Sequence, residues 1–229
     1  MLRASSHRYQ GTPIMTYRQL LASLLLVATA VAPAQAAVTD ASLDAATAAV
    51  MPQVIIWRRD FHQNPELSNR EFRTSKIVAD QLRQMGIEVQ TGIAHTGVVG
   101  ILRGGKPGPT IALRSDMDAL PVTEQGDLPF KSTATSEYRG EKVGVMHACG
   151  HDGHMAILLG AAKVLAGMRN ELPGTVMFIF QPAEEGAPDG ERGGASLMLD
   201  EGLFASNKPD AVFGLHLWSA MNTGAIGYR

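Results

Sequence analysis

Apolar residues recur at helical spacing in two long segments, residues 41–63 and 68–85, and each spacing predicts an amphipathic helix. In the second segment Ser68 is placed to cap the helix, with Glu71 completing a capping box. Asn64-Pro65 ends the first helix and Gly86 follows the second. The pattern predicts two further helices, at 156–168 and 195–201.

Short apolar runs, rich in β-branched residues, separate the helices and predict strands at 87–90, 98–102, 110–114, 175–180 and 211–217. Because strands alternate with helices, we expect an α/β fold with helix, sheet and helix layers and a mixed or mostly parallel sheet. Ligands of such sheets bind beyond the carboxyl ends of the strands. Asp118, Glu184-Glu185 and His216 fall at or just after three predicted strand ends, which favours a site there.

The first 36 residues have the pattern of a secretory signal peptide. A basic segment from Met15 precedes an apolar run from Leu20 to Val31, and Ala34-Gln35-Ala36 provides a cleavage site. We expect cleavage near Ala36 and a periplasmic or secreted protein, with Met15 as an alternative start. A retained membrane anchor is the alternative, but the apolar run is shorter than the about 20 residues that span a bilayer.

Composition narrows the class of protein. A hydrophobic content of 45% and a charged content of 18% are typical of a globular protein. Without the leader, 17 basic and 22 acidic residues give a net charge of −5, and the chain lacks a basic run with interleaved aromatic residues. Nucleic acid is therefore not an expected partner. A single cysteine excludes an internal disulfide.

Residues 144–154 contain the only cysteine and three of the seven histidines. Cys149 and His151 are suited to zinc and related metals, and the neighbouring Gly150 lets the backbone turn so that both side chains can face one ion. One alternative is a structural cysteine beside surface histidines. Another is a helix that places His147 and His151 on one face, as in the His-Glu-x-x-His motif, although no Glu follows His147 and Gly150 disfavours a helix there.

Three other places carry acids or a histidine that could complete the site. One of the adjacent Glu184 and Glu185 could bind a metal while the other takes a proton from water. Asp118 could fix a ligand imidazole through a hydrogen bond. The alternatives are a solvated pair of glutamates, a turn in which Asp116 and Asp118 are solvated, and a core histidine at His216 within an apolar strand.

Four motifs in order resemble one family closely. They are Arg-Ser-Asp-Met-Asp-Ala-Leu-Pro at 114–121, Met-His-Ala-Cys-Gly-His-Asp-Gly-His at 146–154, Gln-Pro-Ala-Glu-Glu-Gly at 181–186 and Gly-Leu-His at 214–216. This is the pattern of the metal-dependent amidohydrolase/peptidase family of hippurate hydrolases, N-acyl-amino acid amidohydrolases and plant auxin-conjugate hydrolases, in its cysteine-containing branch. Residues 58–67 also resemble the family's opening helix, and the resemblance runs from about residue 54 to the end.

The resemblance implies a catalytic domain of the zinc-exopeptidase type over residues 37–229, with two divalent metal ions that could be Zn, Mn, Ni or Co. By motif position, Cys149 would bridge the two ions, and His151, Glu185 and His216 would be further ligands. Glu184 would be the general base that passes a proton from the attacking water to the leaving amine.

Some features depart from the family pattern. Asp118 would match the aspartate of the wider family's His-x-Asp motif, with Asp116 in the position of the histidine, as is usual in this branch. The loop 186–194 is longer than is typical. A lid and dimerisation domain and a last histidine ligand would follow a segment like 214–228, so the chain is expected to be the N-terminal, truncated portion of a protein that forms homo-oligomers through that lid.

The expected activity is metal-dependent hydrolysis of the amide bond of an N-acyl amino acid or a related small, peptide-like amide. The alternatives are an inactive truncated fragment that binds metal without turnover and, with less support, a structural metal module. No stable membrane anchor is expected.

Overall fold

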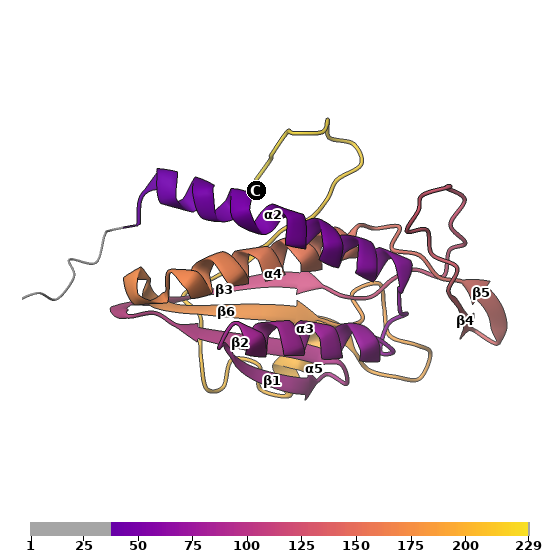
Figure 1. Ribbon diagram of the computed structural model, residues 1–229. Coiled ribbons are helices and arrows are strands. Elements are labelled where there is room, and N and C mark those ends of the chain that lie inside the picture. Colours follow the sequence, from indigo (N-terminus) through magenta and orange to yellow (C-terminus); the bar gives the residue numbers. More distant parts are fainter. Residues whose placement is uncertain (1–37, 229) are drawn as a thin grey trace, which may run out of the picture. The chain divides into compact units, whose positions relative to one another are not determined.

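The computed structural model describes residues 38–228 of the 229-residue chain (Figure 1). The predicted signal peptide, residues 1–36, lies outside the described residues. Within the described part, every helix is too short or too polar to cross a membrane.

A five-stranded mixed sheet forms the centre of the structure, with the strand order β1-β2-β6-β3-β7. Strands β3, β6 and β7 run parallel, whereas β1 and β2 are antiparallel to their neighbours. This confirms the predicted mixed sheet, and the carboxyl ends of the three parallel strands share one edge. The strands are β1 (Glu88–Ile93), β2 (Gly97–Arg103), β3 (Lys106–Asp116), β6 (Pro173–Gln181) and β7 (Ala211–Gly214).

Helices cover both faces of the sheet, as expected for an α/β fold (Figure 1). Strand β6 shows why: its side chains alternate between the two faces, and both sets are buried. Phe178 and Phe180 pack with helices α2 (Asp40–Gln63), α3 (Phe72–Gln84) and α4 (His151–Gly167), whereas Met177 and Ile179 pack with α5 (Gly194–Asp200). The three-layer prediction is thereby confirmed, with α2 packed on α4.

The start of helix α3 differs from the prediction. Residue Glu71, not Ser68, is its N-cap, and the helix begins at Phe72. The Ser68 hydroxyl instead donates a hydrogen bond to Asp118 Oδ2 at 2.7 Å. The predicted capping box is therefore wrong, because a tertiary partner takes the hydroxyl that the local motif would have used.

Three other differences affect the site. Helix α4 begins at His151, five residues earlier than predicted. Strand β7 ends at Gly214, so His216 lies in the following loop and not in an apolar strand. A two-stranded hairpin, β4 (Thr135–Tyr138) and β5 (Glu141–Gly144), was not predicted because its strands are short and largely polar.

Candidate metal centre

The candidate residues converge at the carboxyl edge of the sheet. Asp116 ends β3, Gln181 ends β6 and Gly214 ends β7, and the register pairs Asp116 with Gln181. The loops after these strands carry Asp118, the two glutamates and His216, and α4 begins beside them at His151. The sequence-based expectation that these residues share one edge is therefore met in the structure.

His151 lies at the middle of the cluster. Its imidazole is fully buried, and Nδ1 donates a hydrogen bond to the backbone carbonyl of Asp118 at 2.7 Å. This leaves Nε2 facing Glu184 Oε2 at 3.7 Å and Glu185 Oε1 at 3.8 Å. Nε2 is buried and has no hydrogen-bond partner among the described residues. In its neutral form, a ring held in this way presents one lone pair to the space between the two carboxylates.

Cys149 and His216 complete the cluster on its exposed side. The thiol sulfur lies 3.7 Å from His216 Nε2, while His216 Nδ1 donates to the carbonyl of Leu217 at 2.6 Å. One ligand atom each from Cys149, His151 and His216 lie within 4.8 Å of one another. The same holds for His151, Glu184 and Glu185 and for Asp116, His151 and His154, so His151 belongs to all three groups.

These donors suit a divalent transition metal. Thiolate, imidazole and carboxylate groups are the ligands that zinc and similar ions take in proteins. His151 is shared by three groups of possible ligands, and its Nε2 has no hydrogen-bond partner in the described part of the chain, which fits a site for more than one ion. The geometry therefore fits the predicted ligands Cys149, His151, Glu185 and His216, whose role remains a prediction.

Electrostatics also favour a cation at this place. Burial alone would lower the pKa of His151, but the hydrogen bond to Asp118 and the charges of Asp116 and Asp118 raise it to about 9. Burial and the neighbouring Glu185 raise the pKa of the Cys149 thiol to about 11. The cluster thus carries an excess of negative charge, and a bound metal ion would offset it and favour the thiolate.

Asp118 organises the loop that carries the glutamates. Its Oδ2 accepts hydrogen bonds from the Ser68 hydroxyl at 2.7 Å and from the Glu185 backbone N–H at 2.9 Å. Burial opposes ionisation, but the hydrogen bonds from His151, Ser68 and the Glu185 backbone lower the pKa of Asp118. The main-chain carbonyl of Asp118 lies closer to His151 Nδ1, at 2.7 Å, than its carboxylate oxygen Oδ1 does, at 3.5 Å.

Sequence reasoning missed a second buried pair at the site. His154 Nδ1 donates to Asp116 Oδ1 at 2.7 Å, and the Leu217 backbone N–H donates to His154 Nε2 at 2.8 Å. Burial opposes ionisation of Asp116, but the hydrogen bond from His154 and the charges of His151 and Arg114 lower its pKa to about 2. Because both nitrogens of His154 have partners, it positions Asp116 and the loop after β7. His154 lies three residues after His151 on one helix, and this spacing could have indicated that the two side chains are neighbours.

Two alternatives from the sequence are wrong. Asp116 and Asp118 are 0% and 1% exposed, so they do not form a solvated turn. His147 precedes α4 and therefore cannot share a helix face with His151. His147 is nevertheless buried, and burial lowers its pKa to about 4.

A thiol, imidazoles and carboxylates gathered at the carboxyl edge of an α/β sheet define a metallohydrolase-like site. The chain belongs to the peptidase family M20/M25/M40, whose model matches residues 112–229. It is 49% identical over 177 residues to thermostable carboxypeptidase 2 of Saccharolobus solfataricus, covering 77% of this chain and 42% of that protein. It is 42% identical over 178 residues to the N-acyl-L-amino acid amidohydrolase of Geobacillus stearothermophilus, covering 78% of this chain and 44% of that protein.

Among solved structures, the chain is similar to the YXEP protein of Bacillus subtilis, a dinuclear metal-binding peptidase, with a TM-score of 0.64 and 42% identity. The match covers 74% of this chain and 43% of that one. The chain thus spans about two fifths of the length of the relatives it matches.

Proposed function

We propose that the protein to which this chain belongs hydrolyses the amide bond of N-acyl amino acids or related small amides, with two divalent metal ions. The observation that carries the proposal is the unpartnered Nε2 of His151, which faces Glu184 and Glu185 at 3.7 and 3.8 Å. The relative that is an N-acyl-L-amino acid amidohydrolase supports the substrate class.

In this proposal Cys149, His151, Glu185 and His216 would hold the two metal ions. When bound, such ions polarise a carbonyl group and lower the pKa of water. Zn, Mn, Ni and Co are the candidate ions, and the thiolate favours the softer ones among them.

Glu184 moves the proton. Its side chain is about one third exposed and lies 3.7 Å from His151 Nε2, so it borders both the candidate metal centre and solvent. Its carboxylate takes a proton from the attacking water, whose oxygen bonds to the carbonyl carbon. The carboxyl group then gives that proton to the amide nitrogen as the C–N bond breaks, which releases a carboxylic acid and an amine.

The test is Glu184→Gln, which keeps the shape of the side chain and removes its basicity. We expect turnover of an N-acyl amino acid to fall roughly 100-fold or more while the metal content, measured by elemental analysis, stays at the wild-type level. Glu141→Gln, in the exposed strand β5, is the control and should leave both unchanged. Persistent turnover in Glu184→Gln would place the base elsewhere.

The second candidate function is metal binding without turnover. The exposed position of His216, which contacts Cys149 across 3.7 Å, leaves the centre open on that side and favours this alternative for the 229-residue chain taken alone. Robust metal-dependent hydrolysis by the purified chain would contradict it, and metal binding without hydrolysis would support it.

We also propose that the protein is exported and cleaved near Ala36. The basic segment, apolar run and Ala-x-Ala sequence of residues 15–36 support this. N-terminal sequencing of protein recovered from the periplasm or medium tests it, with Ala37 expected as the first residue.

A further inference from the structure

Residues 183–193 form a compact loop whose two ends meet. The loop begins just after strand β6, at Ala183, and ends just before helix α5, at Gly193. A Cβ added at Gly193 would lie 3.0 Å from Ala183 Cβ and 2.7 Å from Asn69 Oδ1. Glu184 and Glu185 directly follow the first end of the loop. Compact loops with closely spaced ends often carry function, and here the base of the loop sets where the two carboxylates begin.

The short segment between helices α2 and α3 contacts both ends of this loop. At the first end, Asp118 Oδ2 accepts hydrogen bonds from the Ser68 hydroxyl and from the backbone N–H of Glu185. The Glu71 carboxylate accepts another from the backbone N–H of Ala183. The first end of the loop is therefore anchored on both sides of Glu184.

The other end of the loop is held by Asn69 and Arg70. Both oxygens of the Glu191 carboxylate accept hydrogen bonds from Arg70, at 2.5 and 3.1 Å, and Oε2 also accepts one from Asn69 Nδ2 at 3.0 Å. Asn69 Nδ2 and His95 Nε2 each donate to the carbonyl of Arg192 at 3.0 Å. We call Asn69, Arg70 and Glu191 the base clamp.

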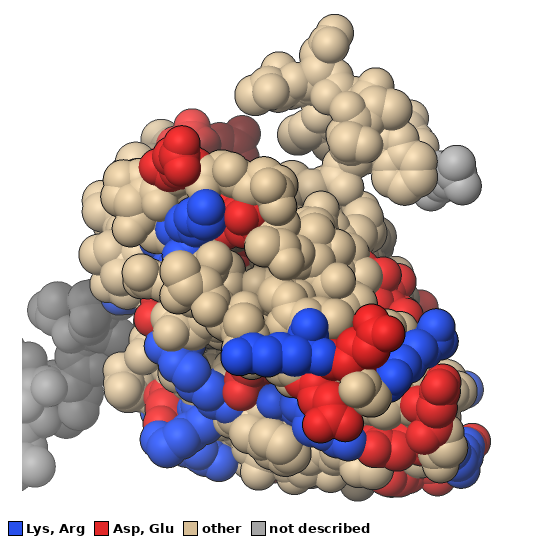
Figure 2. Space-filling model, turned by 90° about the vertical axis from the view of Figure 1, so that its right-hand side faces the viewer, with Lys and Arg blue, Asp and Glu red and all other residues tan. Residues whose placement is uncertain are grey.

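The base clamp differs from an ordinary surface ion pair. Acidic and basic side chains are interspersed over this end of the molecule, so an ion pair alone would not single out a site (Figure 2). Exposed pairs also contribute about 1 kcal/mol or less. In the base clamp, however, Asn69 is buried, and its amide binds the main chain of the loop as well as Glu191. The clamp therefore fixes the backbone of the loop.

Backbone strain is concentrated around the same loop. Among the described residues 38–228, five that are not glycine have a left-handed φ, between 48° and 75°, and each lies in the segment 183–201 or contacts it. These five are Asn69, Ala94, His95, Arg139 and Ala183. Such conformations persist only where the surrounding structure enforces them, and they gather at functional sites. The strain thus indicates that the position of this loop matters for function.

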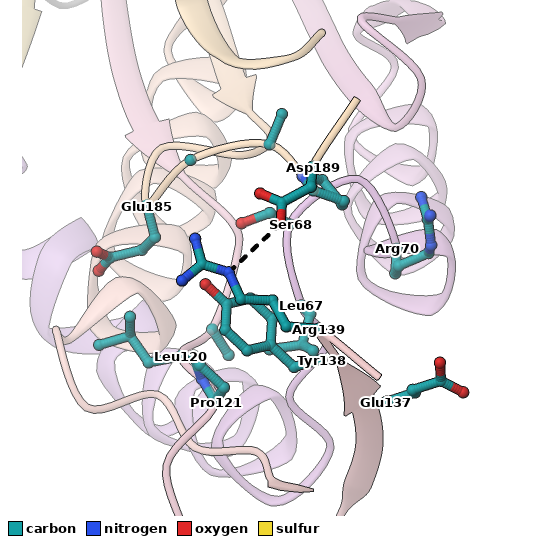
Figure 3. A pocket seen from close by; sticks show the side chains of 14 residues that line it. Leu67, Ser68, Arg70, Leu120, Pro121, Glu137, Tyr138, Arg139, Glu185 and Asp189 are labelled. Atoms are coloured by element: carbon teal, nitrogen blue, oxygen red, sulfur yellow. Dashed lines mark ion pairs between the residues drawn. The ribbon is translucent and has the colours of Figure 1, made fainter. Parts of the chain in front are cut away.

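The middle of the loop is held less firmly than its base. A pocket of about 270 Å³ lies between residues 185–189 and the tip of the β4–β5 hairpin (Figure 3). An ion pair crosses this pocket, from Arg139 Nε to Asp189 Oδ2 at 3.7 Å, and its side chains are 66% and 80% exposed. An exposed pair of this kind gives little support. The position of the two glutamates therefore depends on the contacts at the base of the loop.

We propose that the three residues of the base clamp are positioning residues, which close the base of the loop and thereby hold Glu184 and Glu185 beside His151. The inference rests on the proposed function, in which Glu184 moves a proton and Glu185 binds metal. The clamp residues are not among the groups of possible metal ligands, so they act through the backbone of the loop. When the clamp opens, the loop shifts and both carboxylates move away from His151 Nε2.

The first test is Glu191→Ala, which removes the acceptor of the base clamp. We expect kcat for an N-acyl amino acid to fall about tenfold, with KM changed less than about twofold, because a misplacement of about 1 Å can cost up to about 100-fold in rate. Zinc affinity, measured by competitive titration, should weaken roughly three- to tenfold. Glu191→Gln keeps an oxygen acceptor and should retain about half of kcat or more.

Two further variants show whether the effect passes through Glu184. In a Glu184→Gln background, Glu191→Ala should have little effect on the residual kcat, because the group that the clamp positions has already lost its basicity. Asp80→Asn breaks an exposed ion pair with Lys76, at 2.6 Å within helix α3, and should leave both kcat and zinc affinity unchanged.

Limited proteolysis reports on the clamp without any turnover. The carbonyl of Arg192 accepts hydrogen bonds at the base of the loop, so trypsin can cut the Arg192–Gly193 bond only after the base has opened. Cleavage at this bond is measured by mass spectrometry relative to cleavage after Lys142, in the exposed part of β5. It should be roughly fivefold faster or more in Glu191→Ala than in the wild type, and unchanged in Asp80→Asn.

The outcomes separate this inference from the proposed function. Faster cleavage and weaker zinc binding in Glu191→Ala, without turnover by the wild type, would overturn the hydrolase proposal and support the clamp. If the wild type is active, a kcat of Glu191→Ala within twofold of its value would overturn the clamp, and so would an equal loss of kcat in both Glu184 backgrounds. If the wild type is inactive, unchanged zinc affinity in Glu191→Ala would overturn it.

Discussion

Glu71 Oε1 accepts a hydrogen bond from the backbone N–H of Ala183 at 2.9 Å, although 112 residues separate them. Glu71 is fully buried, and its other oxygen accepts the hydroxyl of Thr96 at 2.6 Å. Ala183 has a φ of 48°, a left-handed conformation that costs an L-residue roughly 1–2 kcal/mol. The buried carboxylate therefore holds a strained turn immediately before Glu184 and Glu185, and so fixes where these two side chains begin.

Burial gives Glu71 a pH-dependent effect on stability. Desolvation raises its pKa from 4.5 to about 7, against the opposing hydrogen bonds from Thr96 and Ala183. Because the folded protein holds this proton more tightly than the unfolded chain, the free energy of unfolding falls as pH rises from 4.5 to 7 and levels off above 7. The contribution lost is about 3 kcal/mol. This pH-dependent contribution should be absent in Glu71→Gln. Urea unfolding at pH 5 and pH 7.5 measures the free energy of unfolding of both proteins.

The stability of Glu71→Gln is compared with that of the wild type at pH 5 and at pH 7.5. Glu71→Gln retains an acceptor for Ala183 and a donor for Thr96, so it should match the wild type at pH 5 and be more stable at pH 7.5. Glu88→Gln, on the exposed strand β1, should follow the wild-type dependence. A stability difference between the wild type and Glu71→Gln that is the same at pH 5 and pH 7.5 would show that Glu71 is ionised throughout.

The sequence was sufficient to predict the edge of the sheet at which the site lies. Asp118, Glu184 and His216 each follow an apolar run, and the carboxyl ends of parallel strands meet at one edge, so strand positions alone bring them together. The family motifs then suggested which of these residues bind metal.

The remaining features depend on tertiary partners that local patterns do not encode. Ser68 and Glu71 matched a capping box, but Asp118 takes the hydroxyl of Ser68, and Glu71 is buried against Ala183. The β4–β5 hairpin lacks an apolar alternation because its strands are mostly exposed and bury no continuous face. No pattern could have shown that its tip lines the same pocket as Glu185.

A second buried network adjoins the candidate metal centre through Asp152, the residue after His151. His62 Nδ1 lies 2.8 Å from Asp152 Oδ2, and His62 Nε2 lies 3.1 Å from Glu124 Oε1. All three side chains are buried. His62→Leu would remove the partner that the two buried carboxylates share, although Asp152 keeps Arg58 at 2.9 Å and Glu124 keeps the Ser132 backbone N–H at 2.6 Å. We expect a loss of about 2 kcal/mol in the free energy of unfolding, measured by urea titration.

An exposed ion pair provides the comparison for His62→Leu. Arg73 Nη2 lies 2.7 Å from Asp60 Oδ1, and both side chains are 40% exposed. Because such pairs contribute about 1 kcal/mol or less, Arg73→Ala should be much milder. Equal losses in the two variants would mean that the His62 network contributes no more than a surface contact.

Gly150 separates Cys149 from His151 and sets the angle between them. Its φ of 96° is one that residues with a Cβ rarely adopt, and a Cβ there would lie 2.8 Å from Leu217 Cδ1. Gly150→Ala should lower the free energy of unfolding by about 1–3 kcal/mol and weaken metal binding, because the strain is relieved by rotating one of the two ligands away. Urea unfolding and a competitive zinc titration measure the two effects.

Gly153→Ala separates backbone strain from steric contact. Its Cβ would approach the same Leu217 Cδ1, at 3.0 Å, but Gly153 lies within helix α4, where alanine is favoured over glycine by about 1 kcal/mol. Leu217 is about half exposed and can move, so Gly153→Ala should be neutral or stabilising and should keep its metal affinity. If both variants lost metal affinity to the same extent, contact with Leu217 would be the cause, and the backbone conformation of Gly150 would not set the geometry of the two ligands.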